Sequence, residues 1–324
     1  MPVLSMIQAI NRTLRDEMKR NDKIVVLGED VGVNGGVFRA TEGLIQEFGP
    51  NRVLDTPLAE SGIIGVSIGM ALYGLRPVPE IQFMDFVYPG FDQIQSELSK
   101  FRYRSGGQFI VPVVIRMPYG GGIKGSHYHS QSTEAFFAHT PGLKVVIPGT
   151  PYDAKGLLTS ALREEDPVMF LEPKKIYRTV RGEVPEDDFT VPIGKANVSR
   201  EGSDVVVFAY GAMLHVALEA AELASAKGIN VEVVDLRTLI PFDIETIMSS
   251  VKKTGRVVIL HEACKTCGFG AEIAAQIAER GILHLKSPIV RVAGFDVPFP
   301  YVLEDDYMPN ASRVLSAIEK VHNF

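Results

Sequence analysis

One carboxylate in this chain of 324 residues stands where a charge is costly. Glu60 comes directly before the apolar run 63–72, which is interrupted only by small residues. A charged group at the head of a segment that must be buried loses its hydration unless it binds a proton or finds a partner. Such carboxylates gather at active sites, so Glu60 is a candidate functional group. The alternative is a structural acid in the first turn of a helix, where the helix dipole favours it.

Two histidines, His127 and His129, follow a glycine-rich segment at 120–125. An extended backbone would place both imidazoles on one face, where His139 could join them as a zinc ligand. One histidine could instead act as a general acid or base on a mobile loop. A structural role is the third possibility, because residues 130–134 resemble a helix cap. The spacing alone leaves all three open.

Three other motifs are formal matches with weak context. Residues 120–125 satisfy G-x-G-x-x-G, but no helix pattern follows, which favours a flexible loop over an NAD site. Residues 65–69 match a serine-hydrolase elbow, but Ser67 lies inside an apolar helical run, which favours packing. Cys264 and Cys267 form a single C-x-x-C with no second pair to complete a zinc site.

Continuous apolar runs alternate with helical patterns in the first half of the chain. The predicted strands are 24–28, 78–83, 112–117, 144–148 and 168–171. The predicted helices are 5–20, 41–48, 62–75, 89–101 and 152–163. Apolar strands between helices indicate a parallel sheet covered on both faces, so we expect a doubly wound α/β fold.

The pattern changes between residues 181 and 202, where charged and turn residues dominate. We expect one domain at 1–180, a linker at 181–202 and a second α/β domain at 203–324. The strands predicted in the second domain are 205–209, 231–235, 257–260 and 289–292. Its predicted helices are 212–227, 243–251 and 270–279.

Charge and hydropathy exclude several classes of partner. The net charge of −6 and the pI near 5.7 give no electrostatic reason to expect nucleic acid or an anionic membrane. The longest apolar run is shorter than the ~20 residues of a membrane helix. The first residues lack the pattern of a secretory signal. We therefore expect a cytoplasmic protein.

Short segments along nearly the whole chain resemble one family. They are residues 28–31, 35–39, 55–61, 80–83, 102–107, 151–158, 234–238 and 253–256. In these the chain is similar to β subunits of thiamine-diphosphate-dependent 2-oxo acid dehydrogenases, the decarboxylating first component of a multienzyme complex. Residues 128–132 and 134–139 look most like the branched-chain enzymes. The resemblance implies a transketolase pyrimidine-type domain followed by a transketolase C-terminal-like domain.

The resemblance also implies roles for individual residues. Glu60 matches the glutamate that hydrogen-bonds N1′ of the cofactor's aminopyrimidine. His129 matches a histidine that donates a proton when the acyl group passes to a lipoyl group. Leu58, Gln82 and Phe86 match positions that line the aminopyrimidine pocket, and Phe86 stands where branched-chain members often carry tyrosine.

The family's Gly-Asp-Gly motif for magnesium diphosphate does not occur in this chain. The resemblance therefore implies that Mg²⁺ is held by an α subunit in an α2β2 heterotetramer and that this chain holds no catalytic metal. It further implies a possible structural K⁺ near 111–114 and 161–166, and docking of a lipoyl acyltransferase core on the C-terminal domain. The alternatives are a pyruvate or acetoin dehydrogenase β subunit, a non-catalytic assembly subunit, or, from the glycine loop alone, an NAD-linked oxidoreductase.

Overall fold

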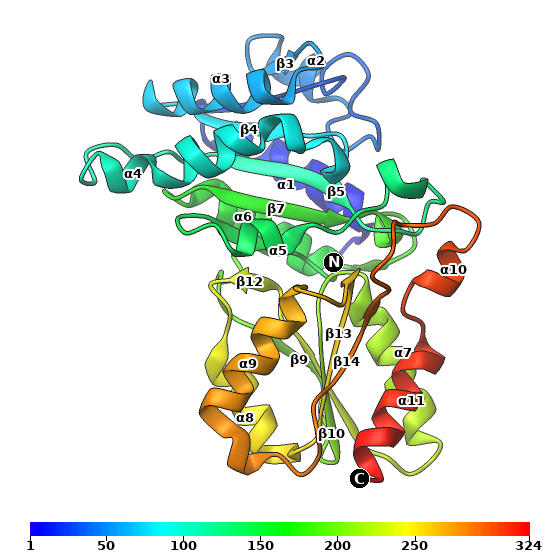
Figure 1. Cartoon of the computed structure of the whole chain (residues 1–324). Helices are drawn as coiled ribbons and strands as arrows, with labels where there is room; N and C mark the ends of the chain where they lie inside the picture. Colours follow the sequence, from blue (N-terminus) through cyan, green and yellow to red (C-terminus); the bar gives the residue numbers. More distant parts are fainter.

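The computed structural model describes residues 1–324 and divides them between two α/β units, drawn one above the other in Figure 1. The first unit is built on a seven-stranded sheet in the order β12-β6-β7-β5-β4-β2-β3, in which only β12 is antiparallel to its neighbour. Its strands are β2 (Ile24–Gly28), β3 (Val53–Asp55), β4 (Arg76–Glu80), β5 (Val114–Tyr119), β6 (Lys144–Val146), β7 (Val168–Pro173) and β12 (Thr238–Ile240). Its helices are α1 (Met6–Arg20), α2 (Leu44–Phe48), α3 (Glu60–Leu72), α4 (Phe101–Arg104), α5 (Glu134–Ala138) and α6 (Pro151–Arg163).

The second unit has a five-stranded sheet in the order β14-β13-β10-β11-β9, with β9 antiparallel at one edge. Helices α8 and α9 cover one face, and α7 and α11 cover the other (Figure 1). The strands are β9 (Asn197–Arg200), β10 (Val205–Ala209), β11 (Val231–Asp235), β13 (Val257–Cys264) and β14 (Val290–Gly294). The helices are α7 (Met213–Ser225), α8 (Ile244–Thr254), α9 (Phe269–Gly281), α10 (Glu304–Tyr307) and α11 (Ala311–His322). The expected doubly wound α/β fold is confirmed.

Local signals explain where the long helices begin. The hydroxyl of Ser5 and the side chain of Gln8 form a reciprocal capping box at the start of α1. Thr150 caps α6, in which Pro151 is the first helical residue. Asp243 caps α8, which ends at Gly255 in the left-handed conformation with φ of 70°.

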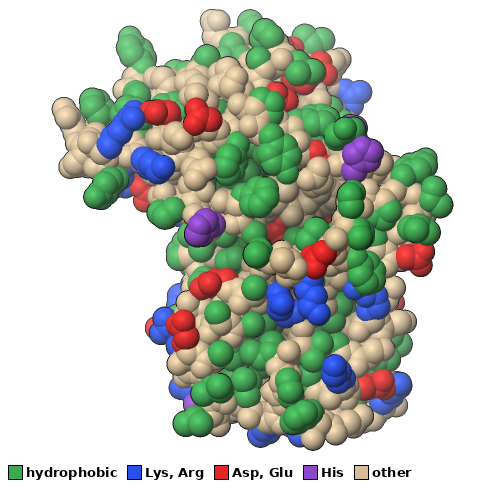
Figure 2. Space-filling view, viewed as in Figure 1, with side chains coloured by type: hydrophobic (Ala, Val, Ile, Leu, Met, Phe, Trp, Pro, Cys, Tyr) green, Lys and Arg blue, Asp and Glu red, His purple; other side chains and the backbone are tan.

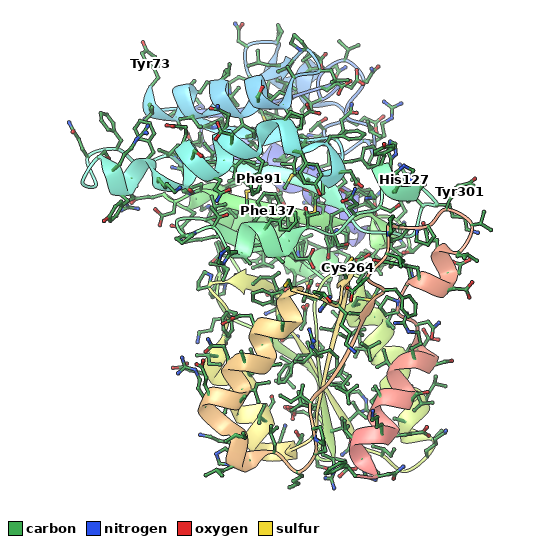
Figure 3. All side chains as sticks on the ribbon, viewed as in Figure 1. Tyr73, Phe91, His127, Phe137, Cys264 and Tyr301 are labelled. Carbon is green, nitrogen blue, oxygen red and sulfur yellow. The ribbon has the colours of Figure 1, made fainter.

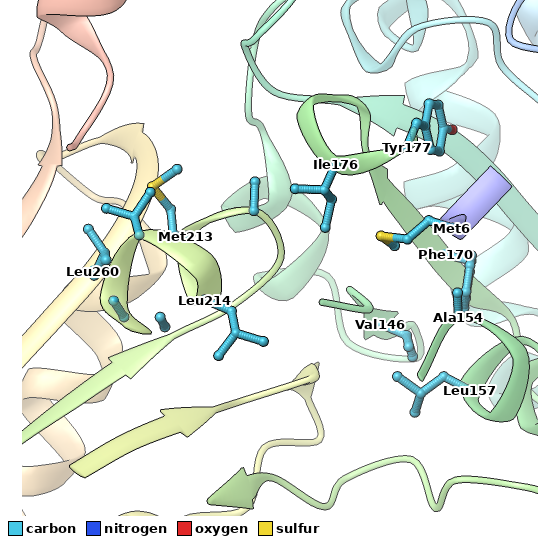
Figure 4. Close-up of a cluster of buried hydrophobic side chains, with 14 of the residues drawn as sticks. Met6, Val146, Ala154, Leu157, Phe170, Ile176, Tyr177, Met213, Leu214 and Leu260 are labelled. Carbon is cyan, nitrogen blue, oxygen red and sulfur yellow. The ribbon is translucent and has the colours of Figure 1, made fainter. Parts of the chain in front are cut away.

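Two hydrophobic clusters form the core, and each contains residues of both units. Along β7, Val168 and Phe170 belong to one cluster, whereas Met169 and Leu171 belong to the other. This alternation is what a strand buried on both faces produces. Figure 4 shows one of the clusters, and its labelled side chains come from both units. The units are therefore packed against each other through apolar side chains.

Several elements differ from the sequence-based expectation. The predicted helix 89–101 is a series of short turns, 88–90, 93–97 and 98–100, before α4. The chain here follows the surface of α3, and a Cβ at Gly90 would lie only 3.1 Å from the carbonyl oxygen of Glu60. Strand β12 lies in the second half of the sequence but extends the sheet of the first unit. The segment 181–202 contributes one strand to each unit. Its β8 (Arg181–Glu183) pairs with β1 (Val3–Ser5) of the first unit, and its β9 pairs with β11 of the second.

None of the helices combines the length and the apolar character that crossing a bilayer requires.

Candidate active site at the carboxyl edge of the first sheet

The predicted site residues follow neighbouring parallel strands. Glu60 comes after β3, and Gln82 and Phe86 come after β4; Glu29, which sequence reasoning did not single out, comes after β2 between these two strands. The carboxyl ends of parallel strands meet at one edge of a sheet, and ligands of α/β proteins bind in the crevice there. The fold thus brings side chains from three separate segments to the same edge.

Glu60 is the first residue of α3 and is 9% exposed. Its carboxylate accepts no hydrogen bond and forms no ion pair within the chain. Burial raises the pKa of the neighbouring Glu29, and the charges of Asp30 and Glu60 raise it further. The carboxylates of these three residues therefore lie close enough to repel one another. Like charges gathered at one edge of a sheet, none of them in an ion pair, favour a ligand that brings a hydrogen-bond donor or a positive charge.

The three predicted lining residues have different surroundings. The Gln82 amide donates to Oδ2 of Asp30 at 3.3 Å, which places it beside the acidic group. The Phe86 ring packs edge-on against Phe83, with ring centroids 5.4 Å apart. Leu58 is 70% exposed. Exposed apolar surface beside a buried, unpaired carboxylate indicates that this site is completed by a ligand or by another chain.

The outer face of α3 is similarly uncovered. Val66 is 54% exposed and Tyr73 is 90% exposed, and Figure 3 shows Tyr73 pointing away from the body of the molecule. The helix is apolar on nearly all sides, yet only one side packs on the sheet. A helix with this pattern normally has neighbours all round.

His129 packs beside the predicted lining residue Phe86. The imidazole lies edge-on to Phe83 and Phe86, with ring centroids 4.6 Å and 5.3 Å away. No hydrogen bond within the chain occupies its ring nitrogens, so they are available to a substrate. Phe86 lies four residues before Gly90, where a Cβ would come within 3.1 Å of the carbonyl oxygen of Glu60. The segment 86–90 therefore runs from the ring beside His129 to the backbone at the start of α3.

The other histidine alternatives have no support in the geometry. Nδ1 of His127 lies 2.9 Å from the hydroxyl of Ser126, and its ring packs on Tyr128. No group of three or more His, Cys, Asp or Glu side chains is arranged to hold a metal ion. Thr133 precedes α5 but makes no side-chain cap, so the helix-cap alternative for residues 130–134 has no support.

The structure also decides between the alternatives for the remaining motifs. The glycine-rich segment 120–125 leads into a single 3₁₀ turn at Ser126–Tyr128, so the helix that an NAD site requires is missing. The hydroxyl of Ser67 lies inside α3 and donates to the carbonyl of Ile63 at 2.8 Å, which fits packing rather than nucleophilic chemistry. Cys264 and Cys267 are free thiols.

Sequence reasoning missed the carboxylates that hold the histidine-bearing loop. Oδ1 of Asp85 accepts the backbone N–H groups of Ser130 and Gln131 at 3.2 Å and 3.0 Å. From the second unit, Glu262 accepts the N–H of Gly121 at 2.9 Å and Glu304 accepts that of Gly122 at 2.8 Å. A signal existed for two of them, because Asp85 follows β4 closely and Glu262 lies near the carboxyl end of an apolar strand.

A cavity of about 470 Å³ opens between the two units beside this loop. Its lining includes His127, Ser130, Gln131, Glu262, Cys264 and Phe299. Figure 3 shows Cys264 at the junction of the two units and His127 on the first unit above that junction. Burial raises the pKa of Glu262 to about 7. In Figure 2 hydrophobic side chains and charges of both signs are interspersed over this face, with no extended basic area.

Comparisons with known proteins agree with this arrangement. The family described as "Transketolase, pyrimidine binding domain" matches residues 3–180, and "Transketolase, C-terminal domain" matches residues 194–314. The β subunit of the pyruvate dehydrogenase E1 component of Bacillus subtilis is 53% identical over 325 residues, and the 2-oxoisovalerate dehydrogenase β subunit of the same organism is 52% identical over 327 residues. Both alignments cover 100% of each chain.

A solved structure gives the same fold. A split-gene transketolase, described as an inactive beta4 tetramer, superposes with a TM-score of 0.82 at 26% identity, covering 99% of this chain and 98% of the other. The two matched families account for both α/β units, and the identity to the dehydrogenase relatives extends over their full length. The chain therefore belongs to the family of β subunits of thiamine-diphosphate-dependent 2-oxo acid dehydrogenases.

Proposed function

We propose that this chain works with an α subunit, in a cytoplasmic α2β2 heterotetramer, to decarboxylate a branched-chain 2-oxo acid oxidatively and to pass the acyl group to a lipoyl group. The observation that carries the proposal is Glu60, a buried carboxylate with no partner in its own chain. By the resemblance to the family, it matches the glutamate that hydrogen-bonds the aminopyrimidine half of thiamine diphosphate. The open apolar surface of Leu58 and α3 beside it is the surface that an α subunit would cover.

The residues at this edge suit one half of the cofactor. A carboxyl group can share a proton with a ring nitrogen, and Phe86, Leu58 and the amide of Gln82 can border a flat heterocycle. Magnesium diphosphate requires several oxygen ligands around the metal. No cluster in this chain offers them, and the nearby carboxylates would repel a diphosphate. We therefore assign the diphosphate and Mg²⁺ to the α subunit.

A structural K⁺ remains a prediction. Near the proposed position, the carboxylates of Glu164 and Asp166 lie 2.6 Å and 3.6 Å from Nζ of Lys144, and Arg102 also binds Asp166. A cation there would depend on backbone carbonyl groups.

When bound, thiamine diphosphate supplies the electron sink for loss of CO2 from a 2-oxo acid. Glu60 would hold the proton shared with the pyrimidine nitrogen. The apolar rings of Phe83 and Phe86 shield the reacting side from water and fix the plane of His129. His129 donates a proton as the acyl group leaves for the lipoyl group.

The branched-chain assignment rests on residues 128–132 and 134–139. The two Bacillus subtilis relatives carry different substrate names and differ by one percentage point of identity, so overall similarity does not discriminate between them. One methylene group in a pocket changes discrimination by only about 1–3 kcal/mol. The substrate must therefore be measured.

The test is reconstitution of this chain with its α subunit, thiamine diphosphate and Mg²⁺. We expect decarboxylation by the pair but not by either chain alone. Steady-state kcat/KM values for 2-oxoisovalerate, pyruvate, 2-oxoglutarate and acetoin should rank 2-oxoisovalerate first. A pair that binds the cofactor without turning over any of them would identify an assembly subunit instead. We assign residues 1–180 to binding of the pyrimidine half and residues 203–324 to docking of the acyltransferase core. Binding assays with the purified core test these two roles separately.

A further inference from the structure

The histidine-bearing loop is held from outside its own unit. Residue Gly120 follows β5, and its N–H donates to the carbonyl of Gln131 at 3.1 Å, so the two ends of the segment 120–131 are tied together. The N–H groups of Gly121 and Gly122 then donate to Glu262 and Glu304 of the second unit. The loop that carries His129 is therefore bonded directly to the C-terminal unit.

The glycines are required for this contact. Gly120 has φ of +81°, and a Cβ there would lie 2.5 Å from Oε2 of Glu262. Gly122 has φ of +100°. Positive φ values and the close approach of a carboxylate both demand glycine. The glycine-rich segment thus serves the approach of Glu262, where sequence reasoning predicted only flexibility.

A buried lysine lies near these carboxylates. We use the name carboxylate clamp for Asp85, Glu262 and Glu304, which together accept four backbone N–H groups of the loop. Nζ of Lys174 lies among their charges, makes no hydrogen bond, and is 5.2 Å from the ring centroid of Phe83. That ring is the one that packs on His129.

We propose that Glu262 is a positioning residue for His129, through which the C-terminal unit fixes the loop for acyl transfer. This inference rests on the proposed role of His129. Glu262 touches the loop backbone rather than any reacting atom. Its loss would leave Gly121 without its acceptor and open space beside Gly120, so the loop and the imidazole would shift. Because the Glu60 edge is held by other elements, decarboxylation should be affected much less than transfer.

The experiment uses the assembled α/β pair with cofactor. Two rates are measured: 2-oxo acid oxidation with an artificial electron acceptor, and reductive acylation of a purified lipoyl domain. Glu262→Ala should lower kcat/KM for the lipoyl domain about tenfold or more, since small misplacements of this kind cost up to about a hundredfold. Oxidation with the artificial acceptor should stay within about twofold of the parent. Glu262→Gln, which keeps an acceptor oxygen for Gly121, should restore most of the transfer rate.

Hydrogen–deuterium exchange provides a second readout. The amides in peptides covering 118–131 should exchange faster in Glu262→Ala than in the parent. Glu232→Gln is the matched control, because Glu232 is equally buried in the same unit but pairs with Lys253 far from the loop. If Glu262→Ala fails to assemble, Glu262→Asp keeps the charge but shortens the reach, and the same two rates are compared.

The outcomes separate this inference from the proposed function. Equal losses of oxidation and transfer in Glu262→Ala would mark a merely structural residue and overturn the inference. Unchanged transfer and exchange, in a background where His129→Ala abolishes transfer, would also overturn it and leave the role of His129 intact. If His129→Ala spares transfer, that role fails and the proposal that Glu262 positions His129 for transfer fails with it.

Discussion

Two groups of buried carboxylates in the first sheet have opposite surroundings. Arg116 is fully buried at the centre of the sheet, 2.7 Å from Glu80 on one side and 2.7 Å and 3.0 Å from Glu172 on the other. The hydroxyl of Tyr177 also donates to Glu172 at 2.5 Å. Glu60 lies at the edge of the same sheet, makes no ion pair, and is close enough to Glu29 for its charge to raise the pKa of that group. The first group is complete within the chain and the second is not.

This difference in surroundings distinguishes a buried acid that is available for chemistry from buried acids that are structural. A charge removed from water is tolerated when a counter-ion and hydrogen bonds replace its hydration. Burial alone would lower the pKa of Arg116, but Glu172 and Glu80 hold that pKa above its usual range. Arg116 is therefore a fixed structural cation. Glu60 has no counter-ion or side-chain partner in this chain, and only the N-terminus of α3 favours its charge. We therefore expect its partner to come with a ligand or with another chain.

The largest effect is expected from removing the charge of Glu60. Glu60→Gln in the assembled pair should lower kcat for decarboxylation by about 10²–10⁴-fold, because a proton can no longer be shared with the cofactor ring. The melting temperature should stay close to that of the parent, since Glu60 makes no ion pair or side-chain hydrogen bond within the chain. Steady-state assays and thermal unfolding measure the two quantities.

The control for this change is Glu183→Gln, which removes an exposed carboxylate on β8. A decarboxylation rate in Glu60→Gln that matches this control would refute the mechanism.

The next largest effect is expected from removing the buried cation Arg116. Arg116→Met should destabilise the fold by about 3–5 kcal/mol, because two buried carboxylates lose their only cation. Chemical unfolding of the purified chain measures the loss. The triple variant that adds Glu80→Gln and Glu172→Gln should recover part of it, since no unpaired charge remains. A single variant as stable as the parent would mean that the sheet tolerates these acids as it tolerates Glu60.

Local patterns explain how much of the fold was predictable. The strands β2, β10 and β11 have the predicted bounds. β2 and β10 are continuous apolar runs, as expected of strands buried on both faces, and β11 departs from this only at Glu232 and Asp235. Strand β12 has only three residues and pairs with a strand about 90 positions earlier, so no local pattern identifies its sheet. The helix α11 was overlooked, although Asn310 at its start is a usable capping signal.

The candidate site was predictable in the same uneven way. Glu60 and His129 stand out by residue type and by the glycines near them, and the resemblance to a family gave them roles. Glu262 and Glu304 accept N–H groups that are 141 and 182 residues away in the sequence. Contacts of this kind depend on how two units dock, and they leave no periodicity or spacing in the chain.

The buried carboxylate of Asp235 has a third kind of environment, with a partner for only one of its oxygens. Oδ1 of Asp235 accepts the backbone N–H of Arg237 at 3.1 Å, but Oδ2 has no partner, and the Arg237 guanidinium pairs with Asp153 at 2.6 Å instead. Burial, and then the charge of Asp153, raises the pKa of Asp235 from 3.8 to about 8. The folded state therefore binds a proton that the unfolded state releases, and stability from this group falls as the pH rises from about 4 to about 8.

Asp235→Asn cannot ionise, so it should unfold with a weaker dependence on pH. Relative to the parent, the variant should gain about 1–3 kcal/mol between pH 5.5 and pH 7.5, which follows from 1.36 kcal/mol per pH unit for one proton. Unfolding free energies of both proteins at these two pH values measure the gain. Glu262 and other buried acids shift both profiles alike, so the difference between the proteins isolates Asp235. Parallel profiles would mean that Arg237 compensates Asp235 as fully as Arg116 compensates Glu172, and Glu60 would then be the single uncompensated acid among the three groups.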